Sequence, residues 1–376
     1  MSVAAHLIPP PVRRLFRRVF PHRPPDRAEL WERTCQKWIV AAVELHDFDG
    51  PVLVIHGWLM APPDLRPHVG FRVNGEEFAK MEYPLPRPDV VERSPFAANA
   101  RESGFLLWKR VAGPDLGDLE LTCIDSRTGK SLGVEYRPFH FPGAERLGPL
   151  PADPHMKRVI GEASAFSFAL GGFTAFRRLE QAVREIAGES LPAFPRVLDW
   201  GCGCGRVSRY FLQLPGCQLT GVDVDEENVG WCREHLTAGS FATVPLRPPT
   251  ELPDANFDLA FGVSVFTHLS EPEQFAWLAE LRRVVRPGGL ALMTFHGEAS
   301  VVWSGLSGER YARLRSHGFC EQANPLYDAN LGEPDYYKDV FHTKEYVRRE
   351  WGKYFEVLAI LPCYLAHQDL VMLRRI

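Results

Sequence analysis

The segment Val197-Leu-Asp-Trp-Gly-Cys-Gly-Cys-Gly205 decides the fold of this chain. An apolar run ends in three alternating glycines, and the apolar pattern of a helix follows over residues 207–214. Glycines allow the backbone to turn tightly and allow a ligand to approach the main chain closely. A strand, a glycine loop and a helix in this order predict the first unit of a parallel, ligand-binding sheet.

Two acidic residues accompany the glycine loop. Asp199 lies in the strand just before Gly201, and Asp223 ends the next expected strand. An acid there can form a charge-assisted contact with a cationic ligand, and an acid at the end of the second strand can accept ribose hydroxyls. The spacing differs from the dinucleotide fingerprint, whose third glycine would fall at Arg206. The alternative interpretation is a tight packing turn flanked by two surface acids.

Strands and helices alternate around this loop. Strands are expected at 196–200, 218–223, 257–263, 290–295, 355–361 and 369–374, and helices at 207–214, 226–236, 270–285 and 342–351. An earlier helix has Phe176, Leu179, Val183 and Ile186 at helical spacing. Such alternation predicts an α/β fold with a parallel, doubly wound sheet.

The first part of the chain has a different pattern. Short apolar runs at 51–56, 69–73, 104–111 and 119–124 are separated by turn residues such as Asn74-Gly75. These runs predict a small antiparallel β-sandwich. Before them, residues 29–43 contain neither glycine nor proline, and we expect a helix there.

The expected domain organisation follows from these patterns. Residues 1–46 are an arm and a helix, 47–148 a β-sandwich-like domain, and 149–376 the α/β domain, with a linker at 149–154. The arm carries four arginines among apolar residues at 11–20, so it could make weak contact with a membrane surface. The alternative is a solvated arm.

Composition excludes several function classes. The 376 residues are 45% hydrophobic and 24% charged, with a net charge of −4, which gives no general attraction to nucleic acid. No apolar run is long enough to predict a membrane-spanning helix. The eight cysteines form no paired C-x-x-C motifs, so we expect no metal site, and scattered thiols favour a cytoplasmic location.

Four motifs in order resemble the class I S-adenosylmethionine (SAM) dependent methyltransferases. They are the glycine segment, Gly221-Val-Asp223, Leu252-Pro-Asp-Ala-Asn-Phe-Asp258 and Leu281-Arg-Arg-Val-Val-Arg-Pro-Gly-Gly289. The resemblance covers about residues 155–376. It implies a seven-stranded Rossmann-like sheet of order 3-2-1-4-5-7-6, with the last strand antiparallel, and SAM as the cofactor.

The resemblance also implies which residues hold the cofactor. Gly201, Gly203 and Gly205 would lie under the methionine portion of SAM, and Asp223 would hold the ribose. Asp199 and Cys202 belong to the same candidate cofactor site, where we expect the thiol to pack rather than act as a nucleophile. Many relatives place an acid after the third strand to contact adenine, but residues 244–250 contain none.

Two histidines are candidate catalytic bases. His268 follows the fourth strand, where relatives place residues that face the transferred methyl group, and His296 follows the fifth. Alternatively, His268 is a histidine at the start of a helix that is hydrogen-bonded to the backbone, and His296 lies in a solvated loop. Between Gly297 and His342 lies a long connection rich in aromatic residues, which could stack on a substrate or fill a small helical cover.

The β-sandwich region loosely resembles accessory β-domains of bacterial glycan enzymes, through Phe71-Arg-Val-Asn-Gly-Glu76, Arg87-Pro-Asp-Val-Val91 and Ser103-Gly-Phe105. This resemblance favours an acceptor hydroxyl on a glycan or a glycosylated small molecule. The alternatives are O- or N-methylation of a small natural product and a SAM-binding protein with a regulatory role.

Overall fold

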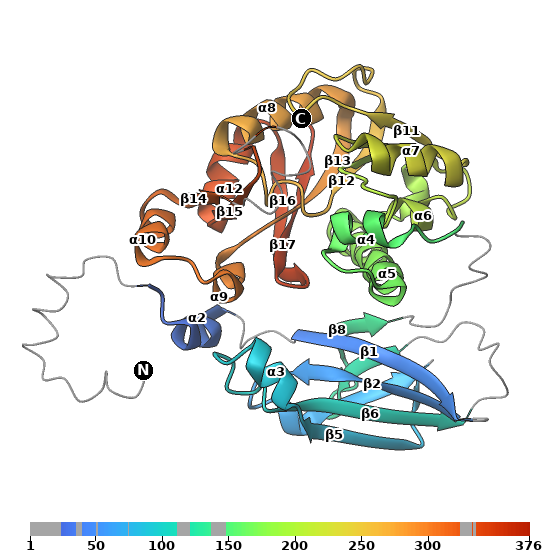
Figure 1. Cartoon of the computed structure of the whole chain (residues 1–376), viewed down its shortest axis with the longest axis vertical. Helices are drawn as coiled ribbons and strands as arrows, with labels where there is room; N and C mark the ends of the chain where they lie inside the picture. Colours follow the sequence, from blue (N-terminus) through green and yellow to red (C-terminus); the bar gives the residue numbers. More distant parts are fainter. Residues whose placement is uncertain are drawn as a thin grey trace, which may run out of the picture.

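A computed structural model describes residues 24–34, 40–49, 52–73, 75–110, 121–136, 148–323, 333 and 336–376. An α/β domain packs beside a smaller β domain, and a short N-terminal helix lies between them (Figure 1).

The α/β domain is built on one seven-stranded sheet. Its strands are β9 (Arg196–Trp200), β10 (Gln218–Asp223), β11 (Ser240–Thr243), β12 (Phe257–Gly262), β13 (Val285–Phe295), β16 (Glu356–Leu365) and β17 (Gln368–Arg374). They are ordered β11-β10-β9-β12-β13-β17-β16. The first five are parallel, and β17 is antiparallel to both β13 and β16. This is a Rossmann-like mixed sheet, and the carboxyl ends of its parallel strands meet at one edge.

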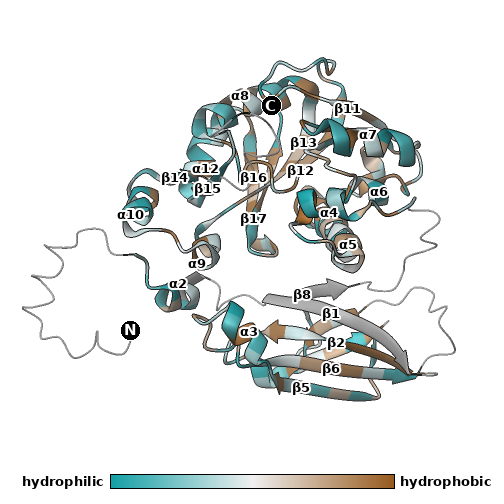
Figure 2. Ribbon diagram, viewed as in Figure 1, coloured by the Kyte–Doolittle hydropathy of each residue, from teal (hydrophilic) through white to brown (hydrophobic). Residues whose placement is uncertain are grey.

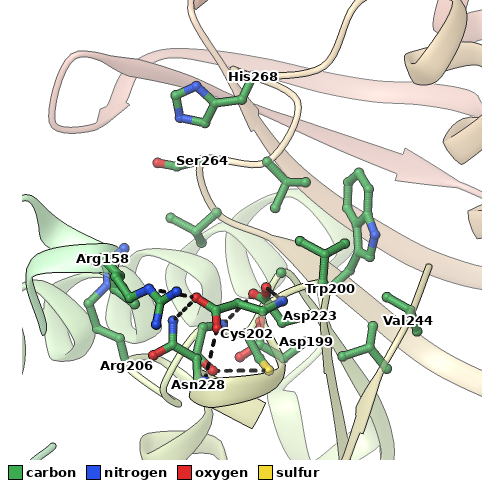
Figure 3. A pocket seen from close by; sticks show the side chains of 18 of the residues that line it. Arg158, Asp199, Trp200, Cys202, Arg206, Asp223, Asn228, Val244, Ser264 and His268 are labelled. Carbon is green, nitrogen blue, oxygen red and sulfur yellow. Dashed lines mark hydrogen bonds and ion pairs between the residues drawn. The ribbon is translucent and has the colours of Figure 1, made fainter. Parts of the chain in front are cut away.

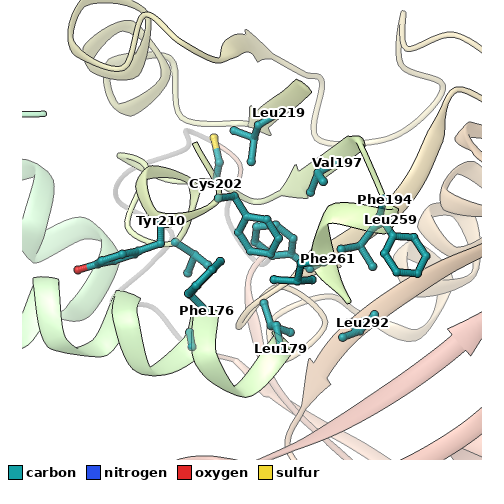
Figure 4. Close-up of a cluster of buried hydrophobic side chains, with 14 of the residues drawn as sticks. Phe176, Leu179, Phe194, Val197, Cys202, Tyr210, Leu219, Leu259, Phe261 and Leu292 are labelled. Carbon is teal, nitrogen blue, oxygen red and sulfur yellow. The ribbon is translucent and has the colours of Figure 1, made fainter. Parts of the chain in front are cut away.

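Helices cover both faces of this sheet. They are α4 (Asp153–Ile160), α5 (Ala165–Ala182) with a π-helical turn (Val183–Ala187), α6 (Ser208–Phe211), α7 (Glu226–His235), α8 (Glu271–Val284) and α12 (Lys344–Glu350). One buried cluster joins α5 and α6 to the sheet, where Phe176, Leu179, Tyr210 and Phe261 are in contact (Figure 4). A second cluster packs α8 and α12 against the opposite face.

Four local predictions in this domain need correction. The expected helix over 207–214 is regular only at Ser208–Phe211, with turns around it. The strand expected at 290–295 begins earlier, at Val285. The expected linker at 149–154 ends in the first turn of α4, because Pro154 is well tolerated near a helix N-terminus. Ile186, expected on the apolar face, is 37% exposed.

A compact insertion follows β13. It contains a 3₁₀ turn, η5 (Glu298–Ser300), then α9 (Val301–Ser304), α10 (Gly308–His317), β14 (Phe319–Ala323) and β15 (Lys338–His342). The two strands form an antiparallel pair. Backbone bonds tie β15 to the sheet edge, since the amides of Val340 and His342 donate to the carbonyls of Thr267 and His296 at 2.9 and 2.8 Å.

The β domain consists of two four-stranded antiparallel sheets. One has the order β1-β2-β6-β5 and the other β4-β3-β7-β8. The strands are β1 (Val40–Asp49), β2 (Val52–Met60), β3 (Val69–Val73), β4 (Glu76–Glu77), β5 (Lys80–Pro86), β6 (Glu102–Arg110), β7 (Leu121–Asp125) and β8 (Ser131–Tyr136), with α3 at Pro88–Arg93. Side chains of both sheets, including Ile55, Phe71 and Leu107, share one buried cluster.

The helix predicted over 29–43 is wrong in its second half. Helix α2 covers only Arg27–Thr34, and β1 begins at Val40. Residues from Val40 to Asp49 pair with β2, and this tertiary pairing outweighs local helix propensity. The expected boundary at 46/47 therefore cuts through β1. The basic arm at 11–20 lies outside the described residues.

The two domains share a hydrophobic core. Trp31 of α2, Phe96 and Trp303 of α9 have ring centroids 5.2–6.0 Å apart. The Arg27 guanidinium lies 4.3 Å from the Phe96 ring centroid. In Figure 2 the apolar colour follows the inner strands, whereas the outer helices α7 and α10 are largely hydrophilic. Helix α2 thus joins the β domain to the insertion that follows β13.

Candidate cofactor and acceptor site

The glycine loop has a backbone that other residues would strain. Gly201, Gly203 and Gly205 have φ of 78°, 52° and 74°. A Cβ atom at Gly203 would lie 2.7 Å from Cγ2 of Val159, and one at Gly201 would overlap Val265. The loop therefore requires glycine at these positions, where a side chain would be strained and would collide with its neighbours.

Strand β10 holds this loop in place. The amides of Gly201 and Cys202 donate to the carbonyl of Val222 at 2.8 and 3.0 Å. The amide of Gly203 donates to Oδ2 of Asp223 at 2.7 Å, and the amide of Asp225 donates to its Oδ1 at 2.9 Å. Asp223 thus fixes the loop and still has lone pairs for a ligand.

A cavity opens at the carboxyl edge of the sheet, above this loop (Figure 3). Among the residues expected at the site, Asp199, Gly201, Cys202, Gly203, Asp223 and His268 line it. Gly205 lies behind the loop, where an added Cβ would overlap Leu236. His296 also lies outside the lining.

Asp199 is a buried acid under the loop. Its Oδ2 accepts a hydrogen bond of 2.5 Å from Ser208, and its side chain is almost wholly inaccessible. Burial raises the pKa of Asp199 to about 7, and the nearby negative charge of Asp223 adds to the shift. Burial likewise raises the pKa of Asp223. A cationic ligand beside either carboxyl group would favour its ionised form and offset the effect of burial.

The thiol of Cys202 is not activated. It contacts Cys232, and this contact together with burial holds the pKa of Cys202 well above its usual value. The group therefore stays protonated at neutral pH, in agreement with a packing role.

Two arginines line the loop side of the cavity, and sequence analysis assigned neither to the site. Arg158 of α4 forms an ion pair with Asp225 at 3.2 Å and also contacts Glu227. Burial lowers the pKa of the Arg206 guanidinium. Among the described residues none forms a hydrogen bond or ion pair with Arg206, which lies against Gly171 of α5.

Apolar and aromatic residues form the far end of the cavity. Val244, Trp277 and Tyr336 line this end, and Trp277 Nε1 donates to the carbonyl of Leu246 at 3.2 Å. The hydroxyl of Tyr336 donates to the same carbonyl. Of the aromatic residues in the long connection, Tyr336 and Tyr337 reach the cavity. Trp303 and Tyr311 pack at the interdomain core instead, and Tyr327 is outside the described residues.

His268 lies on the wall opposite the glycine loop (Figure 3). Its Nδ1 lies 3.1 Å from the carbonyl oxygen of Lys338, which can only accept, so Nδ1 carries the proton. Burial lowers the pKa of His268, so the ring is neutral at pH 7 with Nε2 unprotonated. His268 thus combines two features. It makes the backbone hydrogen bond expected of a histidine at the start of a helix, and its Nε2 is unprotonated at the cavity.

His296 lies beside His268, with ring centroids 6.3 Å apart. Its Nδ1 donates to the carbonyl of Val340 at 3.2 Å, and its ring stacks on Phe341 at 5.3 Å. Burial and the neighbouring His367 lower the pKa of His296 well below its usual value. It packs behind the cavity wall rather than in a solvated loop.

Within the described residues, no group of three or more His, Cys, Asp or Glu side chains is placed to hold a metal ion. The same part of the chain contains no helix long and apolar enough to cross a membrane.

Comparison with known proteins identifies similar sequences. Residues 197–289 match the family model described as a methyltransferase domain. The chain is 34% identical over 162 residues to a malonyl-[acyl-carrier protein] O-methyltransferase of Serratia marcescens, covering 40% of this chain and 60% of that protein. The corresponding protein of Pectobacterium atrosepticum is 31% identical over 183 residues, covering 45% and 68%.

A third relative is a ubiquinone biosynthesis O-methyltransferase of Sinorhizobium fredii, 35% identical over 99 residues, with 25% of this chain and 38% of that protein covered. The chain thus spans between 38% and 68% of the length of these three relatives.

Proposed function

Because the chain belongs to the class I SAM-dependent methyltransferases, we propose that it transfers the methyl group of SAM to a neutral hydroxyl of its acceptor. One observation carries this proposal: His268 and the glycine loop with its two acids, Asp199 and Asp223, line opposite walls of one cavity (Figure 3). When bound, SAM supplies an electrophilic methyl group on its sulfonium.

The residues of the loop side fit the cofactor. Gly201 and Gly203 line the cavity without side chains, and a cationic group would favour the ionised forms of Asp199 and Asp223. We assign the SAM ammonium to the side of Asp199, the ribose hydroxyls to Asp223 and the carboxylate to Arg206. Adenine would lie between Val244 and Trp277, an apolar slot that agrees with the lack of an acid after β11.

His268 is placed to take the acceptor proton. The hydroxyl proton passes to Nε2, while Nδ1–H remains bonded to the carbonyl of Lys338. Asp339, 4.0 Å from Nδ1, stabilises the imidazolium that forms. His296 then acts through packing, since it is absent from the cavity lining.

The charges around the cavity favour a neutral acceptor. Among the residues that line it, the permanent cations are Arg158 and Arg206, and both lie on the loop side, away from His268 (Figure 3). Two relatives are named for a malonyl-[acyl-carrier protein]. A carboxylate acceptor would already be ionised at neutral pH and would need no base. A hydroxyl has little anionic character and benefits from one.

A hydroxyl of a glycan or a glycosylated small molecule is the first candidate acceptor. An aromatic natural product is the second, because Tyr337 lines the acceptor side of the cavity. Methyl-labelled SAM incubated with the full chain and cell extract tests this assignment. Label in a sugar-containing product supports the first acceptor, and label in a sugar-free ether supports the second. Bound SAM with no labelled product would instead support a regulatory SAM-binding protein.

A further inference from the structure

Ser264 has an unusual backbone at the acceptor side of the cavity. It is the second residue after β12 and has a φ of 62°, a left-handed conformation that is energetically unfavourable for a residue with a side chain. Its amide donates to Oγ1 of the buried Thr294 at 2.7 Å, which holds the turn. The conformation directs Ser264 to the same wall as His268 (Figure 3).

Gln368 fixes the hydroxyl of Ser264. It reaches from the start of β17, and its Nε2 donates to Oγ of Ser264 at 2.7 Å. Because Nε2 carries only hydrogens, Ser264 must accept this bond, and its own hydrogen points elsewhere. The Oε1 atom of Gln368 is buried and accepts no hydrogen bond from the described residues.

The acceptor wall therefore presents a hydrogen-bond donor, Ser264, beside a proton acceptor, Nε2 of His268. A donor bonded to the reacting oxygen would draw electron density from it and slow attack on the methyl group. The donor is more useful on a second, non-reacting oxygen of the same molecule. Ser264 and His268 lie four residues apart on the loop that follows β12 and line the same cavity, so both can contact one acceptor molecule.

We propose that Ser264, positioned by Gln368, selects an acceptor with two neighbouring oxygens, one methylated and the other hydrogen-bonded to Ser264. The inference rests on the proposed function. The reacting oxygen forms the new C–O bond as the S–C bond breaks, and its proton passes to Nε2 of His268. The products are a monomethyl ether and S-adenosylhomocysteine (SAH).

Catechol and resorcinol are matched probes, because both carry two phenolic hydroxyls and only the spacing differs. With the full chain and labelled SAM, we expect kcat/KM for catechol to exceed that for resorcinol by about tenfold, the value of one hydrogen bond. Ser264→Gly tests the donor, because glycine tolerates the left-handed backbone. We expect this variant to lose the preference for catechol while its SAH affinity stays within about twofold of wild type.

Gln368→Glu separates positioning from packing. The substitution is nearly isosteric, but a carboxylate can only accept, so the hydrogen of Ser264 would turn toward it and away from the acceptor. We expect the catechol preference to disappear although Ser264 is still present. Gln218→Glu, which adds the same charge at the exposed start of β10, is the control and should keep the preference.

Two outcomes would overturn the inference: equal wild-type rates for the two probes, or a preference that survives Gln368→Glu. Failure of the proposed function would look different. In that case the wild-type chain would bind no SAH, would bind SAH and transfer no methyl group to either probe, or would transfer it at full rate without His268.

Discussion

The two sides of the cavity are built in different ways. The cofactor side, with Asp199, the glycine loop and Asp223, comes from one stretch of chain and is held by main-chain bonds. The acceptor side, with Ser264 and His268, depends on Gln368 and on the carbonyl of Lys338, which lie far away in the sequence. In the proposed complex, a local backbone motif holds the cofactor, while side chains from distant elements contact the acceptor. Substitutions on the two sides should therefore affect different measurements.

The largest expected effect is on the acceptor side. His268→Ala removes the proposed base and should lower turnover with saturating catechol and SAM by about 10²–10⁴-fold. SAM affinity should change little, since the cofactor side is intact. Single-turnover transfer of labelled methyl measures the first quantity and calorimetry the second. His296→Ala is the control; a large loss in this variant with normal turnover in His268→Ala would reverse the two roles.

A substitution on the cofactor side should weaken SAM binding and leave turnover at saturating SAM largely unchanged. Asp223→Ala removes charge-assisted bonds to ribose and to the loop, at a cost of about 1.5–3 kcal/mol of SAM binding. At saturating SAM, turnover should recover most of its wild-type value. Calorimetric titration checks the affinity, with exposed Glu227→Ala as control. An unchanged Kd would remove Asp223 from the cofactor site.

The assignment of the SAM carboxylate to Arg206 can be tested by comparing the two arginines on the cofactor side. Arg206→Gln should weaken SAM binding by about tenfold, because a charged hydrogen bond is lost. It should leave binding of decarboxylated SAM nearly unchanged. Arg158→Gln, which removes a cation already paired with Asp225, should not discriminate between the two ligands. Equal losses for both ligands in Arg206→Gln would show that this arginine holds another group.

The smallest effect expected is a pH dependence of SAM affinity. The pKa of Asp199 is raised to about 7, so the acid is largely protonated below neutrality in the cofactor-free chain. A SAM ammonium favours the ionised form, so affinity should fall as pH drops through 7, by about eightfold from pH 7.5 to 6. Asp199→Asn should flatten this profile. A wild-type affinity independent of pH would contradict the contact.

Sequence analysis succeeded where a structural signal is local. The four sequence motifs are short-range patterns, and their resemblance to class I SAM-dependent methyltransferases was enough to predict the class of enzyme and its cofactor, both of which are confirmed. The left-handed Ser264 has no such signal, because only the bonds to Thr294 and Gln368 reveal it. Arg206 was treated only as a departure from the dinucleotide fingerprint.

The predictions that were wrong concern features set by contacts between segments that are distant in the sequence. Residues 40–43 suit a helix locally but pair with β2 in the structure. His296 follows β13 directly, yet its ring stacks on Phe341 and it is absent from the cavity lining. Glycan specificity and the basic arm at 11–20 as a membrane contact stay predictions, and so does a cytoplasmic location.

The most direct test of the account is where the methyl group of bound SAM lies. NMR of the full chain with methyl-¹³C SAM and labelled histidine can detect protons close to that methyl group. We expect nuclear Overhauser contacts between the methyl group and the ring of His268, lost in His268→Ala without loss of binding. Methyl contacts to Val244 and Trp277, with none to His268, would reverse the orientation of the cofactor and contradict the proposed mechanism.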